Sequence, residues 1–178
     1  KLVGVLNADQ LINFPDFRAH ERCFQLLQQV SGRAGRTKIR GKVIIQSYNP
    51  HHNILQQVSS NQYTKMFDEQ TYQRRIYKYP PYFRIIKLTL KHKDYNRVNE
   101  GAAWLAKALA QLFGPHVLGP EFPPVSRIRN LYHKNILIKI PNDQSLQKTK
   151  IIINRIKNSF SSTKLFRPIR LVINVDNY

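Results

Sequence analysis

The sequence predicts an α/β segment followed by an α+β domain with the element order β-α-β-β-α-β. Residues 2–46 show an apolar run, an amphipathic segment and a second apolar run, which is typical of a strand, a helix and a strand. Residues 84–175 show two longer amphipathic segments, each flanked by alternating or short apolar runs. Between these patterns stand Pro80 and Pro81, and two prolines cannot continue a helix.

The first segment opens with an apolar run over residues 2–6, which predicts a buried strand with a loop at its end. Asp16 is placed to cap a helix over residues 17–30, where Phe17, Phe24, Leu27 and Val30 recur at helical spacing. We expect Gly32 and Gly35 to end that helix. Two further elements are predicted, a strand over residues 42–46 and one long helix over residues 54–76.

The second segment starts with a half-exposed strand over residues 84–92. A helix over residues 94–113 follows and stops at Gly114-Pro115. A strand over residues 116–118, a Pro-rich loop over residues 120–129, a strand over 135–140, a Lys-rich helix over 144–160 and a strand over 170–175 complete the order. This pattern predicts a compact sandwich with both helices on one face of a sheet.

The charge of the chain is strongly one-sided. It has 29 Lys and Arg residues against 10 Asp and Glu, a formal net charge of +19. Residues 84–178 hold 17 of the basic residues and 5 of the acidic ones, so they are the most basic part. Such an excess is typical of proteins with a polyanionic partner, and nucleic acid is the commonest.

Cysteine usage and hydropathy exclude several classes of protein. Cys23 is the only cysteine, so an internal disulfide or a thiolate zinc cluster cannot form, and we expect no metal site in these residues. No apolar run approaches the roughly 20 residues of a membrane span, and no signal-peptide pattern opens the chain. We expect a cytoplasmic, nucleoid-associated protein without a membrane partner. The chain opens in a strand-like run without a methionine, and we expect it to be part of something longer.

The stretch QVSGRAGR, which begins at Gln29, combines glycines with arginines three apart. Gly32 and Gly35 permit unusual backbone conformations and leave space beside a ligand. If the turn stays helical, Arg33 and Arg36 project together, and guanidinium groups bind phosphate oxygens in a bidentate way. Gln29 lies one turn before Arg33 and can help to order the pair. A basic helix C-terminus that complements the helix dipole is the simpler interpretation of the same residues.

The neighbouring sequence changes the weight of these two interpretations. The pattern Q-x-x-G-R-x-G-R after an amphipathic helix resembles motif VI of superfamily 2 helicases, and VGVLNAD sits where those helicases carry motif V. The whole run VGVLNADQLINFPDFRAHERCFQLLQQVSGRAGR is similar to the PriA family, primosomal protein N-prime, the replication restart DNA helicases. The resemblance continues through GKVIIQSYNPHHNIL, through QRR followed by YPP, through VLGP and through the closing VINVD. It covers essentially all 178 residues.

The resemblance implies a domain organisation and an activity. Residues 1–60 would be the C-terminal part of the second RecA-like helicase lobe, residues 61–82 a connector helix and Pro-Pro linker, and residues 83–178 a basic, two-layer βαββαβ C-terminal domain. The parent protein would be an ATP-dependent DNA helicase that unwinds DNA 3′ to 5′. It would recognise stalled or abandoned replication forks and restart replication by primosome assembly.

The resemblance also assigns the phosphate-binding residues. Arg33 and Arg36 would reach the ATP phosphates across a cleft between two lobes, with Gln29 assisting. Asp9 and the surrounding loop would couple the state of the nucleotide to DNA, and the glycines of the motif, Gly32 and Gly35, would lie beside the nucleotide. The family's P-loop, the acidic residues that act with ATP and Mg, and its zinc-binding cysteines have no counterpart in these residues. We therefore expect this chain alone not to hydrolyse ATP.

Basic and aromatic residues crowd the segment from Arg127 to Lys134. Arg127, Arg129, His133 and Lys134 are suited to neutralise phosphates, and Tyr132 is suited to stack on an unpaired base. Further basic residues extend the charge over the first strand and the second helix: Lys87, Lys91, Lys93, Lys148, Lys150, Arg155 and Lys157. For a single lysine a solvated face is the simpler interpretation, but few acidic residues are interspersed in the set. We expect binding to forked, single-stranded and duplex DNA.

The resemblance further implies protein partners: single-stranded DNA-binding protein, other primosome proteins and the loader of the replicative helicase. In the family, the acidic tail of single-stranded DNA-binding protein docks on the C-terminal domain. Gln147 matches a glutamine of that site and Lys148 lies beside it, but Asp143 stands where the family has an arginine. An acidic residue there would repel the tail. Either the pocket is rebuilt from Lys139, Lys148 or Arg167, or tail binding is weaker.

Two other interpretations of the sequence stay open. In the first, the chain is a stand-alone nucleic-acid-binding module in which QVSGRAGR merely touches backbone phosphate. In the second, it is part of another superfamily 2 translocase, including one that acts on RNA. Tyr77, Tyr79 and Tyr82 in the Pro-Pro linker are suited to pack a domain junction, and base stacking is the alternative. A P-loop and a cysteine cluster encoded upstream would favour the restart helicase.

Overall fold

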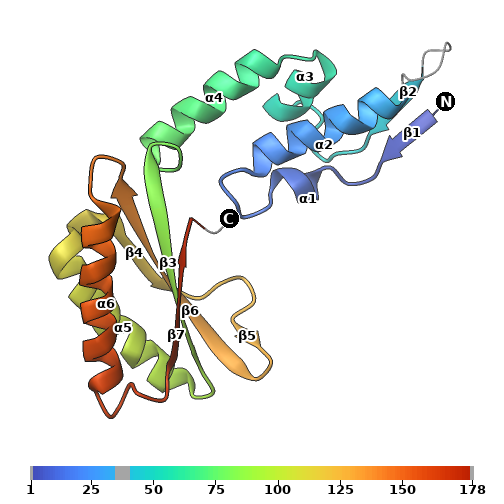
Figure 1. Ribbon diagram of the computed structural model, residues 1–178. Coiled ribbons are helices and arrows are strands. Elements are labelled where there is room, and N and C mark those ends of the chain that lie inside the picture. Colours follow the sequence, from blue (N-terminus) through green and yellow to red (C-terminus); the bar gives the residue numbers. More distant parts are fainter. Residues whose placement is uncertain (1, 35–40, 177–178) are drawn as a thin grey trace. The chain divides into compact units, whose positions relative to one another are not determined.

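A computed structural model describes residues 2–34 and 41–176 of the chain (Figure 1). The chain forms two compact units, of which the first ends at Tyr77 and the second begins at Lys78. Within the described residues, the first unit contains a parallel pair of strands with helices, and the second contains an antiparallel sheet with helices. The architecture is therefore mixed α/β, and each unit has a hydrophobic core of its own.

The first unit is built on two parallel strands that pair from Leu2 with Lys42 to Val5 with Ile45. Its elements are β1 (Leu2–Val5), α1 (Asp9–Ile12), α2 (Ala19–Ala34), β2 (Lys42–Ile45), α3 (Asn53–Ser59) and α4 (Tyr63–Ile76). The buried cluster consists of Ala8, Ile12, Cys23, Phe24, Leu27, Ile54, Leu55, Val58 and Met66. Alternate residues of both strands are exposed, so one face of the strand pair packs on this core and the other does not.

Two helix predictions for the first unit are wrong in their bounds. The helix expected over residues 17–30 begins at Ala19 and continues through Gly32 to Ala34. Glycine disfavours a helix by only about 1 kcal/mol relative to alanine, and the packing of α2 outweighs that cost. The helix expected over residues 54–76 is interrupted between α3 and α4, where Asn61 has a φ of 53°. A left-handed residue cannot continue a right-handed helix.

The second unit has the order β3-α5-β4-β5-β6-α6-β7, which is the predicted order with one additional short strand. The bounds are β3 (Phe83–His92), α5 (Tyr95–Phe113), the 3₁₀ turn η1 (Gly114–His116), β4 (Val117–Glu121), β5 (Arg127–Ile128), β6 (Leu131–Pro141), α6 (Leu146–Ser162) and β7 (Arg170–Val175). The sheet order is β4-β6-β3-β7 with antiparallel pairing throughout, and β5 pairs with β6. Both helices lie on one face of the sheet, as Figure 1 shows.

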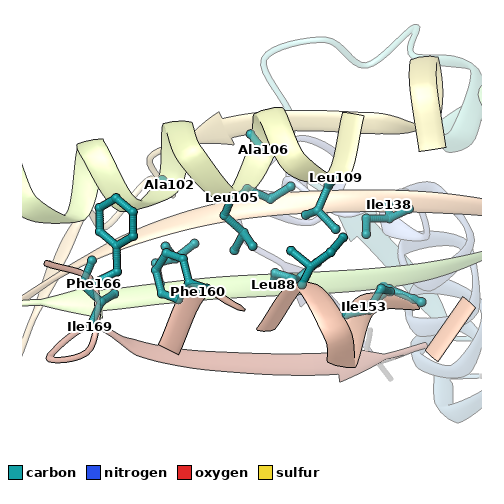
Figure 2. Packing of buried hydrophobic residues seen from close by; sticks show 14 of the residues in the cluster. Leu88, Ala102, Leu105, Ala106, Leu109, Ile138, Ile153, Phe160, Phe166 and Ile169 are labelled. Atoms are coloured by element: carbon teal, nitrogen blue, oxygen red, sulfur yellow. The ribbon is translucent and has the colours of Figure 1, made fainter. Parts of the chain in front are cut away.

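The core of the second unit lies between that face and the two helices (Figure 2). Leu88 of β3, Ile138 of β6 and Leu105 of α5 all belong to this core, and all three are almost completely buried. Phe160 of α6 stacks on Phe166 with ring centroids 5.1 Å apart and planes inclined by 9°. The apolar contacts fix the sheet and the helices as one layer pair, so the opposite face of the sheet is free to carry polar residues.

Local sequence explains where the two helices begin and end. Asp94 accepts a hydrogen bond of 3.0 Å from the backbone N–H of Arg97, and Ser145 accepts one of 3.4 Å from that of Lys148. Both residues are therefore N-caps, which satisfy donors that the first turn leaves unpaired. Gly114, with a φ of 54°, ends α5 as predicted.

The connection from α5 to β6 differs from the prediction. The strand expected over residues 116–118 is preceded by η1 and continues to Glu121, and β5 forms within the expected loop. The register of β4 shifts between Leu118 and Glu121. Gly119 makes this bulge possible, because its φ is 94° and a Cβ there would lie 2.8 Å from the carbonyl oxygen of Asn135.

Candidate nucleic-acid interface

The first candidate site lies at the end of α2. Gln29 and Arg33 are four residues apart on this helix, so they share one face, and both are exposed. A Cβ on Gly32 would meet no atom of the described residues within 4 Å. Gly35 and Arg36 lie outside the described residues. The described part of the motif presents one guanidinium and one amide to solvent.

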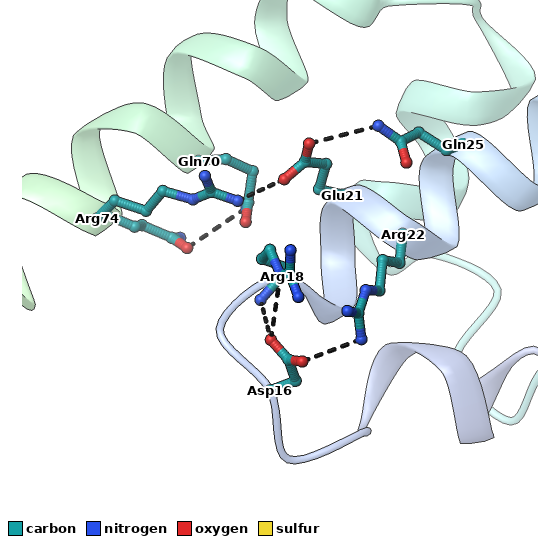
Figure 3. A network of polar contacts seen from close by, with 8 residues as sticks. Asp16, Arg18, Glu21, Arg22, Gln25, Gln70 and Arg74 are labelled. Carbon is teal, nitrogen blue, oxygen red and sulfur yellow. Dashed lines mark hydrogen bonds and ion pairs between the residues drawn. The ribbon is translucent and has the colours of Figure 1, made fainter. Parts of the chain in front are cut away.

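Ion pairs hold the other end of α2 (Figure 3). Asp16 accepts hydrogen bonds from the backbone N–H of Arg18 at 2.8 Å and from the guanidinium of Arg22 at 3.0 Å. Asp16 was expected to cap α2, but it orders the turn before the helix instead. Arg74 of α4 donates a hydrogen bond to Glu21 of α2, which joins the two helices. These contacts orient the helix that carries Arg33.

Asp9 lies at the carboxyl end of the parallel strand pair. Its carboxylate accepts a hydrogen bond from the Ser47 hydroxyl at 2.8 Å and one from the backbone N–H of Tyr48 at 3.0 Å. The bond from Tyr48, assisted by that from Ser47, lowers the pKa of Asp9 below its ordinary value. A cavity of about 150 Å³ lined by these residues, Asn7 and Gln46 adjoins the carboxylate. Asp9 therefore fixes the loop after β2, at the edge where ligands of parallel sheets usually bind.

Cys23 is a core residue. Cys23 is buried in the core of the first unit, and burial raises the pKa of its thiol to about 11. A thiol of this kind stays protonated and unreactive at neutral pH. Among the described residues, no group of three or more His, Cys, Asp or Glu side chains is arranged to hold a metal ion.

Strand register divides the predicted DNA-binding residues between the two faces of the second sheet. Successive residues of a strand point to opposite faces, so His133 and Lys134 separate. Lys134 pairs with Leu90 and Tyr132 with His92, on the face that the helices cover. His133 lies on the other face.

We give the name basic face to four basic residues on that other face: Lys87, Lys91, His133 and Arg170. Lys139 of β6 lies on the same face but is buried. Lys91 of β3 is the register partner of both His133 of β6 and Arg170 of β7, so these three form one row across the sheet. With strands about 4.8 Å apart, the row spans roughly 10 Å, and Lys87 lies about 13 Å along β3 from Lys91. Lys87, Lys91 and His133 are half-buried and Arg170 is exposed.

Two polar residues lie between the side chains of the basic face and are joined by a buried hydrogen bond. Thr89 and Asn135 lie between Lys87 and the row, and the Thr89 hydroxyl donates to Asn135 Oδ1 at 2.9 Å with both residues buried. Burial and, to a smaller extent, the nearby charge of Lys91 lower the pKa of His133. His133 is therefore mostly neutral at pH 7 when no anion is bound, and an approaching phosphate would favour its protonated form.

The residues on the helix-covered face form an aromatic cluster with cations. The guanidinium of Arg127 lies over the Tyr132 ring at 5.1 Å, and Lys134 Nζ lies over the Phe122 ring at 4.3 Å. Tyr95, the first residue of α5, contacts both rings and is 50% exposed. The sequence did not single out Tyr95, Phe122 or Arg170, because nothing local marks them; only the strand register and the helix packing bring them to the two cationic groups.

The predicted partner-binding residues lie in the first turn of α6. Gln147 and Lys148 are exposed there, and Asp143 is exposed in the turn that precedes the helix. Lys139 is only 7% exposed, with its ammonium 3.6 Å from the centre of the Tyr79 ring. Of the three alternatives for rebuilding an acidic-tail pocket, Lys139 is thus buried in the described structure.

Arg167, the third alternative, follows the other end of α6. That helix has 17 residues, so the two ends are about 25 Å apart. Lys148 and Arg167 therefore do not meet in one small pocket. Lys148 remains the cation of the set that adjoins Gln147.

Comparison with known proteins identifies the family. Residues 75–178 match the family model of the primosomal protein N C-terminal domain. The chain belongs to the PriA family of replication restart proteins. The resemblance inferred from the helicase-like motif and the flanking segments is thereby confirmed.

Relatives in the PriA family match well beyond the C-terminal domain. The replication restart protein PriA of Bacillus subtilis is 38% identical over 147 residues, which cover 82% of this chain and 18% of the relative. That of Synechocystis is 39% identical over 158 residues, 88% of this chain and 19% of the relative. That of Treponema pallidum is 36% identical over 151 residues, which cover 83% of this chain and 23% of the relative. The chain thus spans about a fifth of the length of these relatives. In the part of the chain that the structure describes, no helix is long and apolar enough to cross a membrane.

Proposed function

We propose that the chain supplies DNA contacts to an ATP-dependent 3′–5′ DNA helicase that recognises stalled or abandoned replication forks and restarts replication by primosome assembly. Such a protein acts in the cytoplasm on the nucleoid. The basic face is the observation that carries this proposal. Its four basic side chains come from three strands and face away from the core of their unit.

Two properties favour DNA as the ligand of the basic face. The row of Lys91, His133 and Arg170 extends across the sheet rather than converging on a point, which suits successive phosphates of a backbone better than a single small anion. The residues that lie between the four basic side chains on this face carry no charge: Thr89, Asn135, Val172 and Asn174. Forked, single-stranded and duplex DNA all present such a phosphate backbone.

The first unit would belong to the second RecA-like lobe of the helicase. A parallel sheet is usually covered on both faces. Here Leu2 and Ile44 are 65% and 50% exposed, and they lie on the uncovered side of β1 and β2. We propose that further strands and helices of the parent protein complete this sheet, that α4 and the Pro-Pro linker connect it to the C-terminal domain, and that zinc is bound elsewhere in the parent.

The end of α2 would complete a composite ATP site. In this proposal Arg33 and Arg36 contact the phosphates of ATP bound with Mg on another lobe, where a guanidinium stabilises the charge that develops as the γ-phosphoryl group leaves. Gln29 orders the arginines, and Gly32 and Gly35 keep the approach open. Asp9 acts indirectly, because its carboxylate is already occupied by the loop after β2.

We also propose that the start of α6 contacts protein partners. Gln147 and Lys148 are exposed beside each other in the first turn of that helix. The acidic tail of single-stranded DNA-binding protein would dock there, with other primosome proteins and the helicase loader as further partners of the assembled protein. Asp143, exposed in the preceding turn, opposes an acidic ligand, so we expect tail binding to be weak.

The DNA-binding proposal is tested on the 178-residue chain. Removing the charges of Lys87 and Lys91 by glutamine substitution should weaken binding to a duplex in a fluorescence anisotropy titration. A matched variant carries Lys150→Gln and Lys157→Gln on exposed positions of α6 and loses the same charge. If both variants bind equally, the excess charge acts as a whole and the basic face is not the interface.

The ATP proposal is tested in the parent protein. Arg33→Ala should abolish DNA-stimulated ATP hydrolysis and leave fork binding nearly unchanged, while Lys65→Ala at an exposed position of α4 should leave hydrolysis close to the wild-type rate. Normal hydrolysis by Arg33→Ala with loss of fork binding would instead assign Arg33 to DNA. A parent that lacks ATPase activity altogether would leave the chain as a nucleic-acid-binding module.

A further inference from the structure

Three aromatic rings from distant parts of the chain meet at the start of α5. Tyr95 stacks on Phe122 with ring centroids 5.4 Å apart and planes inclined by only 8°. Tyr132 of β6 meets Tyr95 edge-on, with centroids 5.4 Å apart and planes inclined by 79°. The two inner rings, Phe122 and Tyr132, are half-buried, whereas Tyr95 is 50% exposed. Phe122 and Tyr132 therefore hold Tyr95 in a defined orientation. Of the three rings, Tyr95 is the most accessible to a ligand in solvent.

Cations lie over the two inner rings, and in the described part of the chain no cation is recorded over the ring of Tyr95. Arg127 lies over Tyr132 and Lys134 over Phe122, in geometries typical of cation–π contacts. Lys134 also donates a hydrogen bond to the side chain of Asn99, one turn along α5 from Tyr95. These contacts fix the cluster from two sides.

The β5–β6 hairpin brings a further cation to the same end of the sheet. Its two-residue turn consists of Arg129 and Asn130, with φ of 47° and 63°. Turns of this type favour glycine or asparagine, because other residues pay a steric cost at positive φ. An exposed arginine at the first turn position is explained by a role for its charge better than by turn formation.

The balance of charge around Tyr95 favours a polyanion. Arg127, Arg129 and Lys93 are exposed in the adjoining hairpin and loop, whereas the neighbouring acidic residues are Asp94, next to Tyr95 in the chain, and Glu121, next to Phe122. The Asp94 carboxylate already caps α5. A rigid exposed aromatic ring beside cations that can reach phosphates is the arrangement by which proteins hold unpaired nucleotides.

We propose that Tyr95 is the stacking platform for one unpaired base of single-stranded DNA, and that Arg127 and Arg129 contact the phosphates that flank it. This inference rests on the proposed DNA binding and adds a strand preference to it. Bases within a duplex are stacked on their neighbours and offer no free face, so the platform distinguishes single strands from duplex. The basic face, by contrast, contacts phosphates of either form.

The test compares Tyr95→Leu with Tyr95→Phe in the 178-residue chain. Leucine keeps most of the apolar contact with Phe122 and removes the π-face, whereas phenylalanine keeps the ring. Stacking on one base is worth about 1–3 kcal/mol, so Tyr95→Leu should weaken binding to a single-stranded oligonucleotide about 5- to 150-fold. Binding to a duplex should stay unchanged, and Tyr95→Phe should behave as wild type on both.

A second variant reports stacking directly. The chain has a single tryptophan, Trp104, so Tyr95→Trp adds one new fluorophore whose signal is measured against the wild-type chain. Single-stranded DNA should quench this added fluorescence, and duplex should not. This measurement also decides the question if Tyr95→Leu fails to fold.

The outcomes separate the two proposals. Equal losses of single-stranded and duplex binding in Tyr95→Leu, or no loss at all, would overturn the stacking platform and leave DNA binding by the basic face intact. Quenching of the Tyr95→Trp signal by both forms of DNA would overturn it as well. If the wild-type chain binds neither form, the proposed function itself fails.

Discussion

The basic face makes a quantitative prediction about salt. Each phosphate neutralised by a duplex-binding protein changes the slope of log K against log salt by about 0.9. Lysine and arginine side chains carry a charge at pH 7, whereas His133 is mostly neutral there because its pKa is lowered. The triple variant Lys87→Gln, Lys91→Gln, Arg170→Gln should therefore reduce the magnitude of the slope by about 2.7 if each of the three meets one phosphate.

The assay is fluorescence anisotropy with a labelled duplex between 50 and 200 mM salt. Over this fourfold range the wild-type chain should lose about 40-fold more affinity than the triple variant, because a slope difference of about 2.7 acts on a fourfold change in salt. The control variant, Lys150→Gln with Lys157→Gln and Lys164→Gln, removes the same charge from exposed positions in and after α6. A control slope that falls as far as that of the triple variant would refute the reasoning, since the field of the whole chain would then account for binding.

Three further outcomes follow from the second unit. Thr89→Val leaves Asn135 Oδ1 buried without its donor and should lower the free energy of unfolding by about 1–3 kcal/mol in urea, whereas adding Asn135→Leu should recover part of that loss; an equal cost in both variants would contradict this. Phe160→Ala should cost about 3–5 kcal/mol by the same measurement, because it removes a ring that is 1% exposed, and a cost below about 1 kcal/mol would show that the core collapses into the space. Duplex binding should tighten as the pH falls below 6.5, because phosphate raises the lowered pKa of His133 and binding takes up a proton, and His133→Gln should be insensitive over that range.

The pH dependence of stability has the opposite sign. The pKa of His133 is lower in the folded chain than its ordinary value of 6.5, so the unfolded chain binds more protons as the solution becomes acidic. Burial and, less strongly, the neighbouring His52 lower the pKa of His20 in the same way. Both residues therefore contribute stability that is present above pH 6.5 and is lost as the pH falls through their lowered pKa values.

The second unit follows the sequence closely wherever one local rule decides. The last strand over residues 170–175 is confirmed, and so is the stop of α5 at Gly114, because a positive φ at a glycine ends the helix. The alternation of Ile86, Leu88 and Leu90 marks the face that packs on the helices. Apolar periodicity is a local property of the chain, which is why it could be read without the fold.

The first unit shows where local rules compete. Gly32 was expected to end α2, but the buried Leu27 and Ala34 keep the helix packed on both sides of it. Asn61 carries no local signal that outweighs the helical pattern around it, yet its left-handed conformation divides α3 from α4. In both cases tertiary packing outweighs a preference of about 1 kcal/mol or less per residue.

The candidate site divides in the same way. By itself the sequence determined that the chain is a member of the PriA family, that its second half is strongly basic, and which face of each strand is apolar. Only the tertiary structure decided which cations lie together, because alternation assigns a residue to one of two faces but the pairing of distant strands sets its neighbours. A register of Lys91 with both His133 and Arg170 builds the basic face, and a shift by one residue would turn these side chains to the other side. The stacking position of Tyr95 likewise depends on the packing of α5 beside residues from the loop after β4 and from β6. Contacts between such distant segments depend on the whole core and not on any short stretch of sequence.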